Sequence, residues 1–275
     1  MQILLTNDDG ILAPGIEALH HAIRDLGTVT VVAPATVQSA ESHGITFHKP
    51  LMTHEVRVHQ QMEGLAVEGT PADCVKLALK ALWPERHGPG ARPDLVVSGM
   101  NFGANVGINV IYSGTVAAAI EAAFLGVPAI AVSLHIGERG KTHLPRAAWI
   151  ARQAIDLVLR EPLDPHRVVN INVPRTESAD APMPPLRVVT MNTAAAADGY
   201  DRRESPDGRR YYWPSGNGME FVHTAQSSDV EALAQRAVTI TPLHFDLTDH
   251  ARLEAWRKRL TAPAGASSAS AGRPA

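Results

Sequence analysis

The sequence of 275 residues contains a single cysteine, Cys74, which excludes an internal disulfide and favours a reducing compartment. Cys74 lies on the inner face of an expected helix, so we interpret it as a core residue rather than a nucleophile. Positive charge is not in excess either, because 25 Lys and Arg stand against 28 Asp and Glu. This balance does not predict binding to a nucleic-acid polymer, although it allows a small anion held beside a cation.

Long apolar runs are also missing. No run approaches the roughly 18 apolar residues that a membrane helix needs. The N-terminus has no basic region ahead of its apolar residues and no small-residue cleavage site after them. We therefore expect a cytoplasmic protein that does not associate with membranes. The thirteen histidines show no spacing typical of metal ligands.

Strand and helix signals alternate along the chain, which predicts an α/β fold with a mostly parallel central sheet and right-handed crossovers. The elements expected in the first half are strands over 2–6 and 28–33, a helix from Pro14 to Leu26, weak strands around 45–47 and 55–59, a strand over 65–68, a helix starting at 70–73, a strand over 94–98, a helix over 116–125 and a strand over 129–134. Those expected in the second half are a helix over 146–160, strands over 168–172, 186–191 and 238–243, and a helix over about 249–260.

Two C-terminal segments differ from this pattern. Residues 200–218 mix Arg, Asp, aromatic residues and Gly, which predicts a projecting hairpin. Its aromatic residues suit an arm that packs on a neighbouring subunit, and a hairpin folded on its own domain is the alternative. From Ala262 onward the sequence is alanine, glycine, serine and proline without periodicity, which predicts disorder.

Two adjacent carboxylates, Asp8 and Asp9, stand at the end of the first expected strand. Partial burial and mutual repulsion make such a pair costly, and a bound divalent cation offsets both effects. The alternative is a solvated turn whose second acid caps a helix.

Further oxygen-bearing side chains follow the ends of other strands, namely Ser39, Asn101 and the segment 113–115. Because the carboxyl ends of parallel strands share one edge of the sheet, we expect these groups to converge on Asp8 and Asp9. A set of two carboxylates, a hydroxyl and an amide oxygen suits Mg²⁺ or Mn²⁺ better than Zn²⁺.

The segment Ser113, Gly114 and Thr115 directly precedes a helix, where backbone N–H groups and hydroxyls favour a bound phosphate. A plain Ser/Thr helix cap explains the same residues equally well. Asn101 and Asn105, in the glycine-containing segment 99–107, are further candidates for contacting the substrate and its phosphate. Glycine spacing alone is a weak signal.

Six segments together match one known family, and they follow its order from residue 6 to residue 248. They are TNDDG with APGI (6–16), VVAP with QS (31–39), EGTPADCV (68–75), SGMNFGANVG (98–107), YSGTVAAAIEA (112–122) and TPLHFDLT (241–248). These segments resemble the survival protein SurE family of metal-dependent nucleotidases. The resemblance implies a three-layer, Rossmann-like (SurE-like) α/β domain over 1–260. We expect a nucleotidase core over 1–140, a C-terminal part over 141–260 with an oligomerisation arm at about 195–222, and a disordered tail over 261–275.

The resemblance also implies the site and the reaction. One divalent metal ion per subunit, Mg²⁺ or Mn²⁺, would be held by four residues, which we call the four predicted ligands: Asp8, Asp9, Ser39 and Asn101. Asp8 and Asp9 are also the candidate catalytic residues, because one of the two could accept the proton of the attacking water, and the sequence leaves open which one. Members of this family remove phosphate from nucleoside 5′- or 3′-monophosphates, some also trim polyphosphate, and they form homodimers or homotetramers.

The chain departs from the family pattern at three places. Ala35-Thr36 replaces a frequent acidic-basic pair, Ala40 stands where glycine is usual, and Ile108-Asn109 stands where acidic residues are frequent. All three are expected beside the pocket, so they bear on substrate preference more than on the reaction.

Two other functions remain compatible with the residues. One is a non-catalytic, metal-dependent nucleotide sensor. The other is a phosphatase with an aspartyl-phosphate intermediate, which needs a second acid two residues after the nucleophile. Asp8 and Asp9 are adjacent and would point to opposite sides of a continuing strand, which argues against the second alternative.

Overall fold

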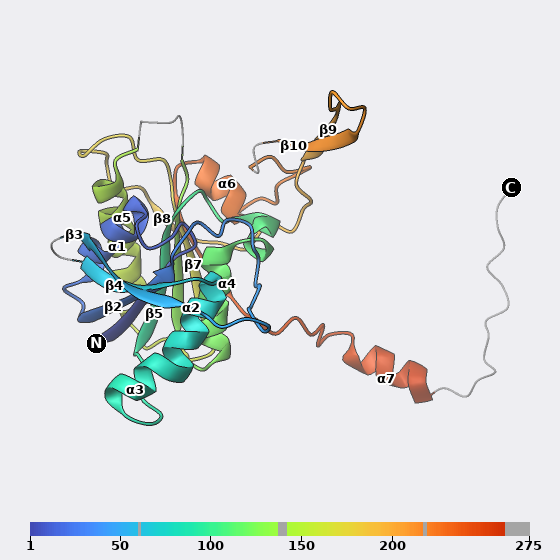
Figure 1. Ribbon diagram of the computed structural model, residues 1–275. Coiled ribbons are helices and arrows are strands. Elements are labelled where there is room, and N and C mark those ends of the chain that lie inside the picture. Colours follow the sequence, from blue (N-terminus) through green and yellow to red (C-terminus); the bar gives the residue numbers. More distant parts are fainter. Residues whose placement is uncertain (60–61, 137–141, 217–218, 262–275) are drawn as a thin grey trace, which may run out of the picture. The chain divides into compact units, whose positions relative to one another are not determined.

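The computed structural model describes residues 1–59, 62–136, 142–216 and 219–261. The chain divides into two units, of which the first comprises Met1–His244 and the second begins at Phe245. In the first unit a nine-stranded sheet lies between two layers of helices (Figure 1). The predicted three-layer α/β fold is therefore confirmed. The single domain predicted over 1–260 stays a prediction, and the predicted tail beyond Thr261 lies outside the described residues.

The central sheet is mostly parallel, as predicted. Its strands lie in the order β3-β4-β2-β1-β5-β6-β7-β11-β8. They span Gln2–Thr6 (β1), Thr28–Pro34 (β2), Thr53–His59 (β3), Met62–Val67 (β4), Leu95–Phe102 (β5), Ala129–Leu134 (β6), Val168–Val173 (β7), Leu186–Val188 (β8) and Val238–Leu243 (β11). Only the pairs β3–β4 and β7–β11 are antiparallel within this sheet of the described chain. The carboxyl ends of β1, β2, β5 and β6 therefore share one edge.

Helices cover both faces of the sheet. They span Pro14–Ile23 (α1), Pro71–Leu77 (α2), Trp83–His87 (α3), Gly114–Phe124 (α4), Leu144–Val158 (α5), Asp229–Ala234 (α6) and Leu253–Thr261 (α7), with a π-helical turn at Ala78–Leu82 (η1) and a 3₁₀ turn at Gly107–Ile111 (η2). Helix α1 packs against α5, and α2 packs against α4 on the other face (Figure 1). Ile3 and Leu5 belong to the core beneath α1 and α5. Leu4 is buried too, and it points to the other face because successive strand side chains alternate.

Local chemistry sets the starts of the helices near the predicted site. Thr70 caps α2: its side chain accepts a hydrogen bond from the Asp73 N–H, and the Asp73 carboxylate accepts one from the Thr70 N–H. Pro71 occupies the first turn, where its missing N–H costs nothing. This predicted helix start is confirmed. Cys74 lies fully buried on α2, and burial raises the pKa of its thiol, which agrees with a core residue.

Several elements differ from the sequence-based expectation. Residues 45–47 form no strand, because the Thr46 N–H donates to the Asp73 carboxylate at 2.8 Å instead of to a neighbouring strand. Strand β5 continues to Phe102, so Asn101 lies in a strand rather than in a loop, opposite Ser133 of β6. Strand β8 ends at Val188, three residues earlier than predicted. The short helix α6 was not predicted.

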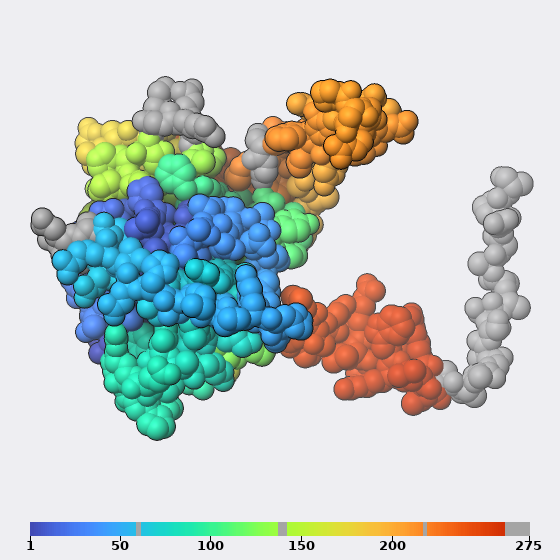
Figure 2. Space-filling view, viewed as in Figure 1, coloured from blue at the N-terminus to red at the C-terminus, as the bar shows by residue number. Residues whose placement is uncertain are grey.

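The predicted hairpin over 200–218 is present as β9 (Gly199–Glu204) and β10 (Arg210–Ser215), which pair antiparallel. Its side chains, including Tyr211, Tyr212 and Trp213, are largely exposed, and Figure 2 shows the hairpin in orange as a separate lobe. Its predicted role as an oligomerisation arm stays a prediction.

In the second unit, α7 begins at Leu253, four residues later than the helix predicted from about 249. Leu253 is half-buried, and the other residues of α7 are exposed. Within the described ranges, none of the helices has the length and apolar character that crossing a membrane requires.

Candidate active site

A cavity of about 510 Å³ contains all four predicted ligands in its lining. They reach it from the end of β1, from the segment after β2 and from the end of β5, as the parallel topology predicted. The other residues that line it are Ala40, Phe102, Gly103, Ala104, Asn105, Asn109, Tyr112, Ser113, His135, Ile136 and Met219. A larger cavity of about 840 Å³ lies against β2–β4 and α3 and is lined by none of the predicted site residues.

Asp8 is the most enclosed carboxylate of this cavity, at 4% exposure. Its Oδ1 accepts a hydrogen bond of 2.5 Å from the Thr115 hydroxyl at the start of α4. Burial raises the pKa of Asp8 to about 6, the Thr115 hydroxyl opposes that rise, and the neighbouring charge of Asp9 adds to it. An ionised Asp8 is thus held in the fold at a cost.

Asp9 is half-buried beside it, and burial raises the pKa of this carboxyl as well. Its Oδ2 accepts a hydrogen bond of 2.9 Å from the Phe102 N–H, at the end of β5. This contact ties the end of β1 to the end of β5 and sets Asp9 next to Asn101.

Backbone contacts place the remaining predicted ligands. The Gln38 N–H donates to the Asp8 carbonyl at 2.8 Å, which holds the segment before Ser39 against the end of β1. The Asn101 Nδ2 donates to the Gly103 carbonyl at 2.7 Å, and this fixes the rotation of the amide. The Asn101 Oδ1 is then the side-chain atom left for a cation.

The donor set fits a hard divalent cation. Two desolvated carboxylates with raised pKa values need positive charge, and the hydroxyl of Ser39 and the amide oxygen of Asn101 add neutral oxygen donors. In the part of the chain that the structure describes, no three His, Cys, Asp or Glu side chains cluster as metal ligands. The donor atoms of the four predicted ligands are all oxygens, which suit a hard cation better than zinc, a metal that prefers nitrogen and sulfur.

In the predicted phosphate segment 113–115, Ser113 and Thr115 make different contacts. Ser113 lines the cavity and caps α4, where its hydroxyl oxygen accepts a hydrogen bond of 3.1 Å from the Val116 N–H. The hydroxyl proton remains available to a ligand, so capping and phosphate binding are compatible. Thr115 is fully buried, and its hydroxyl already donates to Asp8. In the described part of the chain, the residues that line the cavity do not include Gly114 and Thr115.

Asn105 lines the cavity but is also part of a buried amide network. Its Nδ2 donates to the Ser133 hydroxyl at 2.8 Å, and its carbonyl accepts hydrogen bonds from the side chains of Asn170 and Asn172. These contacts hold the segment between β5 and η2 against β6 and β7. The substrate-binding role of Asn105 stays a prediction.

Sequence reasoning missed several residues of the cavity. His135 follows β6 directly and is half-buried, and its pKa is lowered by burial and then by the positive charges of Arg175 and Arg236. Its position just after a predicted strand was the signal that could have found it. Phe102 and Tyr112, at 45% and 57% exposure, provide aromatic surface beside the predicted ligands.

Asp229 is a buried acid that contacts the segment between Asn105 and Ser113. Its carboxylate accepts hydrogen bonds from the N–H groups of Gly107 at 2.8 Å and Asn192 at 2.9 Å, and burial raises its pKa. It thereby fixes the start of η2, the turn that leads to Ser113. No motif in the sequence marked it.

The fold and the site define an α/β protein whose oxygen-rich cavity lies at the carboxyl edge of a parallel sheet, where such folds bind their ligands. A sequence model described as survival protein SurE matches residues 3–197. The chain therefore belongs to the survival protein SurE family, which confirms the resemblance seen in the sequence.

Individual relatives support this placement. The chain is 42% identical over 262 residues to the 5′-nucleotidase SurE of Desulforudis audaxviator, with 94% of this chain and 97% of that protein covered. It is 46% identical over 250 residues to the 5′-nucleotidase SurE of Rhodopirellula baltica, with 90% and 94% covered. The crystal structure of the SurE protein from Aquifex aeolicus superposes with a TM-score of 0.78 at 32% identity, covering 94% of this chain and 100% of that one.

Proposed function

We propose that this protein is a metal-dependent 5′-nucleotidase, which hydrolyses nucleoside 5′-monophosphates to a nucleoside and phosphate. Nucleoside 3′-monophosphates and short polyphosphates are proposed as further substrates. The observation that carries this proposal is the single cavity that gathers the four predicted ligands and Ser113 in a chain of this family. The relatives named 5′-nucleotidase SurE support the same reaction.

The four predicted ligands would hold one divalent cation, Mg²⁺ or Mn²⁺. When bound, such a cation supplies charge neutralisation for phosphoryl oxygens and lowers the pKa of a coordinated water. The protein contributes placement: Phe102 fixes Asp9 and Gly103 fixes the Asn101 amide, so little reorganisation is needed when the site is loaded.

The chain's own groups then act on the phosphate and the water. Ser113, at the start of α4, donates its hydroxyl proton to a phosphoryl oxygen and orients the phosphate for in-line attack. Asp9 presents more of its carboxylate to the cavity than Asp8, because it is only half-buried. We assign to Asp9 the acceptance of a proton from the attacking water.

The aromatic surface of Phe102 and Tyr112 lies on the same cavity and suits the flat base of a nucleotide. The hairpin β9–β10 is proposed to pack on a second copy in a homodimer or homotetramer, because its aromatic residues are exposed on this chain. A cytoplasmic location is proposed from the single cysteine, which suits a reducing compartment.

The test is phosphate release from a nucleoside 5′-monophosphate, measured with Mn²⁺ and with EDTA. We expect turnover that depends on Mn²⁺ and is lost in Asp9→Asn. Asp180→Asn is the matched control, because Asp180 is exposed and outside the cavity. Binding of Mn²⁺ and nucleotide without phosphate release would establish the sensor instead. Full turnover of Asp9→Asn at saturating Mn²⁺ would overturn the site assignment.

A further inference from the structure

The segment that carries Ser39 has an unusual backbone. We call residues 39–46 the site loop; it begins at Ser39 and leads from β2 toward β3 without regular structure. Ala40 and Ser42 adopt φ angles of +60° and +55°, in the left-handed region that L-residues with a side chain rarely occupy. Such a conformation persists only where surrounding contacts hold it.

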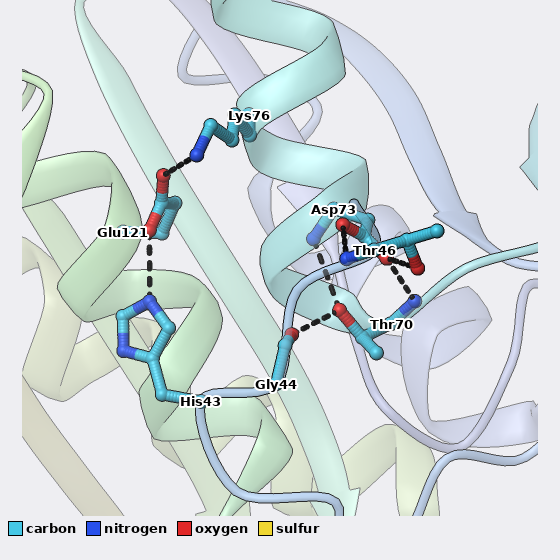
Figure 3. A network of polar contacts seen from close by, with 7 residues as sticks. All are labelled: His43, Gly44, Thr46, Thr70, Asp73, Lys76 and Glu121. Carbon is cyan, nitrogen blue, oxygen red and sulfur yellow. Dashed lines mark hydrogen bonds and ion pairs between the residues drawn. The ribbon is translucent and has the colours of Figure 1, made fainter. Parts of the chain in front are cut away.

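The far end of the site loop is held by α2 (Figure 3). The Thr70 hydroxyl donates to the Gly44 carbonyl at 2.6 Å. The N–H and the hydroxyl of Thr46 donate to the two oxygens of Asp73 at 2.8 and 2.7 Å. These contacts fix residues 44–46, five to seven positions after Ser39, and belong to the capping arrangement of α2.

The end near Ser39 is held by α4 and the turn before it. The Ser42 N–H donates to the Tyr112 carbonyl at 3.2 Å, and its hydroxyl donates to the Ile111 carbonyl at 2.8 Å. His43 Nε2 lies 2.8 Å from the Glu121 Oε2, two turns along α4, as Figure 3 shows. Among these contacts, the one between His43 and Glu121 joins side chains only and can be removed without changing the backbone.

The position of Glu121 is unfavourable for an ionised carboxylate. It lies at 4% exposure on an alanine-rich helix, where an ionised carboxylate loses its hydration. Its Oε1 has no hydrogen-bond partner in the described part of the chain, and the Lys76 Nζ stands 4.0 Å away, too far for a hydrogen bond. The close partner of this buried acid therefore comes from the site loop.

Helix α4 contacts both Asp8 and the site loop. At its start Thr115 holds Asp8, and two turns later Glu121 holds His43. One helix thus links Asp8 to His43 of the site loop. A helix of 11 residues with nine buried positions gives little freedom for the spacing between them to change.

We propose that His43 and Glu121 are positioning residues, which fix the site loop so that the Ser39 hydroxyl is held beside Asp8, Asp9 and Asn101. This inference rests on the proposed function, because it takes Ser39 as a metal ligand. The pair touches neither the metal nor the substrate and acts through the backbone of residues 39–43. Its loss leaves every ligand present but poorly placed.

The experiment compares His43→Ala with Thr46→Val in the full chain. His43→Ala removes the contact near Ser39, whereas Thr46→Val removes one hydrogen bond at the far end of the same loop. Binding of Mn²⁺ alone is measured by calorimetry, together with Tm, and with kcat and KM at saturating Mn²⁺. Glu121→Gln serves as the conservative variant, because a glutamine can still hydrogen-bond to His43.

We expect His43→Ala to weaken Mn²⁺ binding about tenfold, the lower end of the loss seen when groups that orient metal ligands are removed. Its kcat should recover at saturating Mn²⁺. Thr46→Val should lower Tm and bind Mn²⁺ like the parent, and Glu121→Gln should retain most of the parent's Mn²⁺ affinity. Glu121→Ala should match His43→Ala; if it does not fold, His43→Ala remains the test, because His43 is exposed.

Parent-like Mn²⁺ affinity in His43→Ala overturns the inference. Equal loss of affinity in His43→Ala and Thr46→Val also overturns it, because the effect would then be general loosening of the loop. Ser39→Ala separates the two proposals. If the parent binds no Mn²⁺, or if Ser39→Ala binds it like the parent, the proposed metal site fails, whatever His43→Ala does.

Discussion

Asp8→Asn in the metal-free protein tests the electrostatics of the site most directly. Burial raises the pKa of Asp8 from its ordinary value of 3.8 to about 6. At about 1.4 kcal/mol for each pKa unit, the ionised carboxylate costs the metal-free fold at most about 3 kcal/mol. Asparagine carries no charge, and its amide oxygen can still accept the hydrogen bond from Thr115. The substitution should therefore stabilise the protein without metal.

The direction with pH follows from the raised pKa. Between about pH 4 and pH 6 the folded state holds the Asp8 proton more tightly than the unfolded chain does. The contribution of Asp8 to stability is therefore present below its unfolded pKa and is lost as the pH rises through about 6. The Asp8→Asn variant does not lose stability in this way, because asparagine does not ionise. Its advantage should be small at pH 4 and reach about 1–3 kcal/mol at pH 7.5, or several degrees in Tm for a chain of this size.

The assay is thermal unfolding in EDTA from pH 4 to pH 8, followed by circular dichroism. Asp180→Asn is again the control, because its carboxylate is exposed and outside the cavity. A Tm difference between Asp8→Asn and the parent that does not change with pH would refute the reasoning. With saturating Mn²⁺ the order should reverse, because only the parent gains full binding free energy.

Three further predictions concern Ser113, the backbone of Ala40 and the hairpin β9–β10. Ser113→Ala should lower kcat/KM about ten- to a hundredfold and weaken inhibition by inorganic phosphate, since a hydrogen bond to a charged group contributes roughly 1.5–3 kcal/mol. A loss of stability of about 1 kcal/mol with unchanged phosphate inhibition would mean that Ser113 is only a helix cap. Ala40→Gly should raise the free energy of unfolding in urea by about 0.5–1 kcal/mol, because Ala40 has a φ of +60°, and a loss of stability would contradict that conformation. Deletion of 202–210 should reduce the number of subunits in the assembly, which light scattering measures. An unchanged number of subunits would favour a hairpin folded on its own domain.

Local chemistry explains which parts of the fold could be predicted. The strand over 129–134 was predicted with its correct bounds, because a fully buried strand is a continuous apolar run. The start of α2 followed from Thr70 and Asp73, which act within one turn. Residues 45–47 could not be predicted, because the group that binds the Thr46 N–H lies 27 residues away in the sequence.

The site, too, has features that the order of elements predicts and contacts between distant residues that it does not. The four predicted ligands meet in one cavity because parallel strands end at one edge, which the order of strands and helices already indicates. The hydrogen bond from Thr115 to Asp8 spans 107 residues and no spacing rule reveals it. The sequence therefore indicated Thr115 as a polar residue of the site but not the contact of its hydroxyl with Asp8, and its predicted role in phosphate binding stays a prediction.

The start of α4 shows why a glycine precedes Thr115. A Cβ at Gly114 would lie 2.8 Å from the Asp8 Cβ and 3.1 Å from its Oδ2, which is closer than side chains pack. Gly114 is not in the left-handed region, so its role is close approach rather than a turn. This approach lets the N–H and the hydroxyl of Thr115 both reach Asp8, and both contacts oppose the rise in its pKa. The start of α4 therefore stabilises the carboxylate of Asp8. Ser113, which lies two residues before Thr115 and lines the cavity, is the residue of this segment that we propose to contact phosphate.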